Sequence, residues 1–197
     1  LFKLKFKRDL IMALPDSAKI SIGTLIVVAD ATDYANNQGR GTRTNQIDLT
    51  SLAAGAARQG DKLDFTANMD LEYILGSSVE WATAPAAGET VDFYISWSNS
   101  GTAATNNSGG VSGSDSAYTG YSSNLADSLK QLQYLGSMVA TVQATTTVQI
   151  DTGVSTFTPR ARYGTLVVVN NSAADALMND AVEMAVRITP LVTQIQD

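Results

Sequence analysis

The nine residues Thr90-Val91-Asp92-Phe93-Tyr94-Ile95-Ser96-Trp97-Ser98 decide the fold class of this 197-residue chain. Large apolar residues occupy every second position from Val91 to Trp97. Because successive side chains of an extended strand point to opposite faces, this spacing places the apolar residues on one face. The stretch therefore predicts a β-strand with one face in the core.

Further segments of this kind recur on both sides, separated by turns rich in Gly, Asn and Ser. They predict strands at residues 24–29, 46–50, 71–75, 79–81, 136–142, 146–152, 155–158, 163–170 and 182–195. We expect Gly76-Ser77-Ser78 to form a hairpin turn, and Pro190 to split the last strand or place it at a sheet edge. Helical spacing is confined to residues 125–135, with Asn124 as N-cap, and to an Ala-rich turn at 52–58.

This count of roughly nine or ten strands predicts an all-β fold with one or two short helices. Helices do not alternate with the strands, so a parallel α/β sheet is not expected. A β-sandwich or barrel fits the spacing, and a β-sandwich of the jelly-roll kind is the arrangement we expect. We predict an extended basic N-terminal arm at residues 1–16 and a single β-sandwich domain at residues 17–197.

Two residue types that carry much of enzyme chemistry are missing. The chain has no Cys and no His, which excludes disulfides, thiolate metal sites and catalytic triads built on His. We therefore expect no cofactor and no enzymatic activity. No stretch approaches the roughly 18–20 consecutive apolar residues of a membrane span, so no membrane contact is expected.

Carboxylates are the acid–base groups that remain. Three pairs lie close in sequence: Asp61 with Asp64, Asp70 with Glu72, and Glu89 with Asp92. A retaining glycosidase needs two carboxyl groups about 5 Å apart in a cleft, and a calcium site of the EF-hand kind needs an Asp-rich loop ending in Gly. The spacing here is unspecific and that loop is absent, so we expect solvated surface carboxylates.

The first eight residues combine a strand pattern with positive charge. Apolar and basic residues alternate before a final arginine, in the order Phe2, Lys3, Leu4, Lys5, Phe6, Lys7 and Arg8. Residues 1–11 carry a net charge of +3, so the rest of the chain carries −9 (the total of −6 minus +3). We expect the arm to add as a strand to a neighbouring subunit. Contact with nucleic acid or another anionic surface, and an extension foreign to the native chain, are alternatives; the acidic body makes nucleic acid an unfavourable main partner.

A second candidate contact is the segment from Ser98 to Asn124, in which 20 of 27 residues are Ser, Thr, Asn or Gly. A loop of this length is usually functional or mobile. We expect its Tyr118 and Tyr121 to contact a neighbouring protein, with packing inside the loop as the alternative. The other large aromatic candidates, Trp81, Tyr94 and Trp97, could stack on sugar rings or belong to the core.

Two segments suggest a family. Residues 85–94 (PAAGETVDFY) and residues 160–171 (RARYGTLVVVNN), in a chain of this length without Cys or His, resemble small virion structural proteins of tailed bacteriophages. Among these the chain is most similar to the jelly-roll decoration (cement) proteins of capsid shells. The resemblance implies a location on the capsid surface of the virion, contact with the major capsid protein or other virion subunits, and homo-oligomers, with a trimer favoured.

These observations lead to one functional expectation. We expect a non-enzymatic virion structural protein that decorates or cements a capsid through subunit–subunit contacts at residues 2–8, Tyr118 and Tyr121. The alternative is a β-sandwich module that binds carbohydrate or a host surface, for which exposed aromatic side chains should line a groove.

Overall fold

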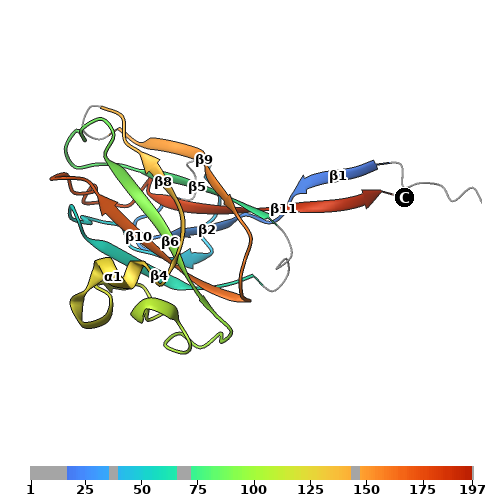
Figure 1. The fold of residues 1–197 in the computed structure, drawn as a ribbon. Helices are drawn as coiled ribbons and strands as arrows, with labels where there is room; N and C mark the ends of the chain where they lie inside the picture. The colour runs from blue at the N-terminus through green and yellow to red at the C-terminus, as the bar shows by residue number, and fades with distance from the viewer. Residues whose placement is uncertain (1–16, 36–39, 66–71, 143–146, 197) are drawn as a thin grey trace, which may run out of the picture.

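The strands form two sheets in the computed structural model, which describes residues 17–35, 40–65, 72–142 and 147–196. Sheet A has the order β3-β2-β11-β5-β9, and β1 pairs with the far end of β11. Sheet B has the order β7-β4-β10-β6-β8. Paired strands are antiparallel except β2 and β3, which are parallel. The mostly β architecture predicted from the sequence is confirmed (Figure 1).

The elements have the following bounds. The strands of sheet A are β1 Ser17–Ile22, β2 Ile26–Ala29, β3 Asn45–Gln46, β5 Glu72–Val79, β9 Gln149–Phe157 and β11 Ala185–Gln196. The strands of sheet B are β4 Ala57–Asp64, β6 Thr90–Ser98, β7 Ser116–Tyr118, β8 Gln133–Val139 and β10 Tyr163–Asn171. The helical segments are α1 Leu125–Leu129 and two 3₁₀ turns, Ser108–Gly110 and Tyr121–Ser123.

The core lies between the two sheets, and β6 shows why. Its Val91, Phe93 and Ile95 are fully buried, as the period-two pattern predicts. They belong to one cluster with residues from both sheets, among them Leu75 of β5 and Val168 of β10. Complete burial of such a side chain contributes about 1.5–3 kcal/mol, so the inner face of β6 is a large part of what stabilises the sandwich.

The hairpin predicted at Gly76-Ser77-Ser78 is wrong, because these residues lie inside the single strand β5. Ser77 and Ser78 are buried, and their hydroxyl groups donate to main-chain oxygens of Ala185 at 3.4 Å and Glu183 at 2.8 Å. The small polar side chains are thus satisfied by the neighbouring strand. The pairing of β5 with β9 shifts register between Leu75 and Ser77, so the chain is irregular here without forming a turn.

The prediction for Pro190 is also wrong, since β11 continues through it as an interior strand. On one side β11 changes partner here, from Ile26 of β2 opposite Ile188 to Ile22 of β1 opposite Leu191. Proline lacks an N–H and is tolerated where the ladder is interrupted. The backbone N–H of Gly23 donates to the Pro190 oxygen at 2.9 Å and closes the junction.

The short helix is confirmed at its start and ends earlier than predicted. The Asn124 side chain accepts a hydrogen bond from the Asp127 N–H at 3.2 Å, which caps α1. Residues from Gln133 onward form β8 because they pair with β6. The Ala-rich turn at 52–58 is not helical: Ala57 already begins β4. The two strands predicted around 146–158 are one strand, β9.

Candidate functional site

A two-stranded ribbon extends from the sandwich and is the first candidate for a functional surface (Figure 1). It consists of β1 and the end of β11, paired from Ser17 opposite Gln196 to Ile22 opposite Leu191. Strand β5 pairs with β11 only as far as Leu191. Beyond that residue, within the described part of the chain, β11 has β1 as its single neighbour. With respect to the described residues, both outer edges of the ribbon therefore present unpaired backbone groups.

The register gives the two faces of the ribbon different chemistry. Residues that are directly opposite on antiparallel strands share a face. One face holds Ile22 opposite Leu191, and the other holds Ser21 opposite Val192. Ile22 and Leu191 thus form an apolar pair on one side. The side chain of Ile22 is 73% exposed, so at this position none of the described residues covers that side.

The strand β1 was not predicted from the sequence, although its residues carry a signal. Ser-Ala-Lys-Ile-Ser-Ile at residues 17–22 alternates with period two, like the strands that were predicted. The predicted contact residues of the arm, Phe2 to Arg8, lie outside the described residues, and their role stays a prediction. They precede β1 by a few residues along the chain.

Tyr118 is not an exposed contact, and the prediction of a partner contact for it is wrong. Its side chain is 2% exposed. It packs in a second apolar cluster with Leu132, Val167 and Val169, on the outer face of sheet B. Its hydroxyl group donates to the Gly109 oxygen at 2.5 Å. Burial raises the pKa of Tyr118 above its ordinary value. The physical reason for the error is that the 98–124 loop has an apolar centre of its own.

Polar side chains from sheet B hold the same loop in place. The Lys62 ammonium donates to the main-chain oxygens of Ser100, Thr102 and Thr105 at 2.9, 2.7 and 3.2 Å. Further along, the Arg58 Nε donates to Asp115 at 2.7 Å, and the Asp48 N–H donates to the same carboxylate at 3.2 Å. Each of these contacts joins residues that are far apart in the sequence. Together they make the loop a fixed cover of sheet B.

The electrostatics of Asp115 follow from these contacts. Burial works to raise the pKa of this carboxyl, but the Arg58 hydrogen bond, the Asp48 N–H and the Gln46 amide outweigh burial and lower the pKa below its ordinary value. Reciprocally, the Asp115 hydrogen bond raises the pKa of Arg58. The pair is therefore charged and structural at neutral pH.

Tyr121 lies on the outside of this loop. Its side chain is 54% exposed, and its backbone N–H donates to the Ser128 hydroxyl at 2.9 Å. The side chain is available for a partner contact, and that role stays a prediction.

Four of the six carboxylates that the sequence offered for catalysis have structural partners, and Glu72 is exposed at the start of β5. Glu89 accepts the N–H groups of Ala86 and Ala173, both at 2.9 Å. Asp64 pairs with Arg162 at 3.3 Å, and Asp61 accepts the Asp115 N–H at 3.1 Å. Asp92 accepts from the Ser137 hydroxyl, and Asp70 lies outside the described residues. Among the residues with described positions, no group of three or more carboxylates is placed to hold a metal ion.

The aromatic residues offered for sugar stacking are mostly internal. Trp81 is 2% exposed, and Trp97 packs against the main core with its Nε1 donating to Gln133 at 2.7 Å. Tyr94 is on the opposite face of β6 from Trp97, as predicted, and lies against Tyr134 with ring centroids 5.3 Å apart. Tyr134 is 53% exposed. Tyr134 is therefore exposed beside a half-buried Tyr94, and neither residue lines the pocket between β8 and β9.

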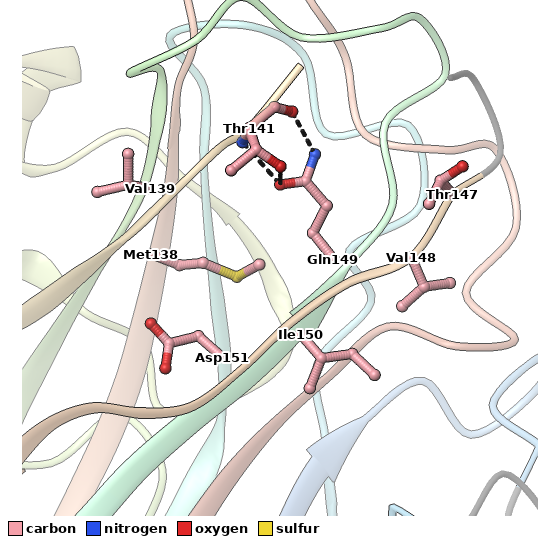
Figure 2. Close-up of a pocket in the computed structure, with 8 residues that line it drawn as sticks. All are labelled: Met138, Val139, Thr141, Thr147, Val148, Gln149, Ile150 and Asp151. Atoms are coloured by element: carbon pink, nitrogen blue, oxygen red, sulfur yellow. Dashed lines mark hydrogen bonds between the residues drawn. The ribbon is translucent and has the colours of Figure 1, made fainter. Parts of the chain in front are cut away.

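A pocket of about 340 Å³ lies between the end of β8 and the start of β9 (Figure 2). Gln149 closes one side: its amide donates to the Thr141 oxygen at 2.8 Å and accepts the Thr141 N–H at 2.8 Å. Val139 and Ile150 at its rim are 57% and 50% exposed. Asp151 is the one carboxylate in the lining. The pocket offers an apolar rim without a paired acid and base.

Comparison of the chain with models of protein families, with curated proteins and with solved structures found no match. In the described part of the chain, no helix is long and apolar enough to cross a membrane.

Proposed function

We propose that this chain is a non-enzymatic structural protein of a virion shell, which joins subunits through the β1–β11 ribbon and the basic arm ahead of it. One observation carries the proposal: the ribbon extends beyond the sandwich and carries an apolar pair, Ile22 opposite Leu191, in which Ile22 is 73% exposed. An isolated two-stranded ribbon is marginally stable in water. A neighbouring subunit that covers the apolar face and extends the free edges supplies the missing contacts.

The strand order supports a jelly roll, the fold that we propose for the body. Four strands of sheet A follow the order β2-β11-β5-β9, and four strands of sheet B follow β4-β10-β6-β8. Along the chain, consecutive strands of this set change sheet at every step except from β6 to β8, which are neighbours. Double-sheet jelly rolls of eight strands recur in viral capsid proteins and in lectins.

We propose a second copy of this chain as the partner of the ribbon. Charge complementarity favours this occupant, because residues 1–11 carry +3 and the remaining residues carry −9 (−6 minus +3). A cationic segment that precedes the ribbon in the sequence is attracted to the acidic body of the next copy. The resulting homo-oligomer, with a trimer as the expected form, would sit on the major capsid protein at the capsid surface.

The test compares two lysine substitutions on neighbouring residues of β1. Ile22→Lys places a charge on the apolar face, whereas Ser21→Lys places the same charge on the opposite face. We expect wild type and Ser21→Lys to sediment as the same oligomer and Ile22→Lys to sediment as a monomer. A monomeric wild-type protein across the micromolar range would contradict self-association through the ribbon. Co-sedimentation of that monomer with capsids would then identify the capsid protein as the partner.

A further inference from the structure

Two arginine side chains lie together on the outer face of sheet A. Arg187 is in β11, in register with Val27 of β2 and Gly76 of β5. Its neighbours in sequence, Val186 and Ile188, belong to the core, so Arg187 is on the opposite face of the strand. Arg40 lies in the segment before β3. Together Arg40 and Arg187 line a pocket of about 180 Å³.

Three nitrogen atoms of these two half-buried arginines are themselves buried and have no hydrogen-bond partner among the described residues. Arg187 donates from Nη2 to the Ser77 oxygen at 3.2 Å, but its Nε is buried and has no partner among the described residues. Nε and Nη1 of Arg40 are also buried and have no hydrogen-bond partner among the described residues. The Arg40 side chain is 11% exposed, and its Nη1 lies 3.9 Å from a Glu183 oxygen. That distance allows attraction and is too long for a hydrogen bond.

The arrangement is electrostatically unfavourable as it stands. Burial is the largest cause that lowers the pKa of Arg187, and the neighbouring Arg40 charge lowers it further, although Tyr34 and Asp151 act in the opposite direction. A buried N–H of a charged group without an acceptor costs more than that of a neutral group. In folded proteins such groups are usually satisfied by water or a bound ion.

We propose that Arg40 and Arg187 form a binding site for a small oxyanion, either a phosphate or a carboxylate group. Guanidinium groups match both anions because they present several N–H donors in a fixed plane. Thr152 and Thr189 add hydroxyl groups to the lining, and Gly76 leaves space beside them. A bound anion accepts hydrogen bonds from the unsatisfied nitrogen atoms and offsets the repulsion between the two arginines. The site is independent of the function proposed for the ribbon.

The binding test uses the full chain, titrated calorimetrically with inorganic phosphate and separately with acetate at constant ionic strength. We expect saturable binding of at least one anion, weakened on the order of tenfold to a hundredfold by Arg187→Gln and by Arg40→Gln. Arg160→Gln is the matched control, because Arg160 is exposed and lies outside the pocket lining. A preference for phosphate points to a free or covalently bound phosphate, and a preference for acetate points to a carboxylate-bearing ligand.

Thermal unfolding separates ligand binding from a purely structural role. Without either anion, we expect Arg187→Gln to be at least as stable as wild type, because an uncompensated buried charge is removed and glutamine keeps a donor. With the anion, the Tm of wild type and of Arg160→Gln should rise, and that of the two pocket variants should rise less. Equal responses in all four proteins, or no binding of either anion to folded wild type, would overturn the proposal.

Discussion

The 98–124 loop and the β1–β11 ribbon differ in how well they are packed, and in each case the packing is the reverse of what composition or backbone regularity suggests. The loop has the composition of a mobile segment, yet Tyr118 is buried within it and Lys62, Arg58 and Gln59 hold it by hydrogen bonds. The ribbon is regular β-structure, yet it extends from the body with Ile22 73% exposed. Regular backbone is therefore no measure of how well a segment is packed in this chain.

The difference lies in what satisfies each segment. Every long loop must find partners for its backbone polar groups, and this loop finds them in side chains of sheet B. The backbone of the ribbon satisfies part of its own hydrogen bonding by pairing, but the apolar side chain of Ile22 needs a surface that the described residues do not supply. The uncovered apolar side chain of the ribbon is the observation that points to a partner.

The largest effect is expected from Tyr118→Ala. Removing a buried aromatic side chain leaves a cavity and costs about 3 kcal/mol of unfolding free energy. Tyr121→Ala is the control from the same loop, and we expect it to change stability by less than about 0.5 kcal/mol because Tyr121 is 54% exposed. Urea unfolding of both variants measures this. Equal losses would show that the loop has no packed interior.

Asp115→Asn should cost about 2 kcal/mol at neutral pH, since it removes the charge that Arg58 and the Asp48 N–H bind. The pKa of Asp115 is lowered in the folded state. Its contribution is therefore complete above the unfolded pKa of about 3.9 and is lost as the pH falls through the folded pKa.

Stability of wild type and Asp115→Asn, measured between pH 3 and pH 7, checks the sign. We expect the two curves to converge toward low pH and to separate above about pH 4. A difference that stays constant over this window would mean that the ion pair adds nothing to the hold on the loop.

Lys62→Met should have a smaller effect of about 1 kcal/mol, because it removes one set of hydrogen bonds at the margin of the loop. Hydrogen exchange should accelerate at residues 99–105 and remain unchanged in β6. Lys130→Met is the control, as Lys130 forms a surface ion pair with Asp127 and does not bind the segment at 99–105. Faster exchange in both variants would argue against a specific role for Lys62.

The smallest effect on the single chain is expected from Ile22→Lys, below about 0.5 kcal/mol, because the side chain is already exposed. The assembled protein should behave differently. The Tm of wild type should rise with protein concentration, whereas that of Ile22→Lys should not. A wild-type Tm that is independent of concentration would contradict self-association through the ribbon. The ribbon would then resemble the loop in having no contact with a second copy.

Local pattern predicted the elements whose residues carry their own signal. The alternation in Thr90–Ser98 predicted β6 with its inner face, and Asn124 predicted the start of α1. Local pattern failed at Ser77 and Ser78, whose hydroxyl groups bind residues more than 100 positions away in the sequence. It also failed at Pro190, which lies where β11 changes its neighbour from β2 to β1. The aromatic loop residues were assigned from composition, which contains no information on the cluster around Tyr118.

By itself the sequence determined the all-β class, the strands with clear alternation, the absence of His and Cys chemistry and the charge contrast between arm and body. These properties are sums over residues or patterns among near neighbours. The tertiary structure alone decided which segments are covered: Tyr118 is buried, Ile22 is exposed, and Arg40 lies beside Arg187. Burial and charge proximity depend on contacts between distant residues, and those contacts exist only after the two sheets have packed.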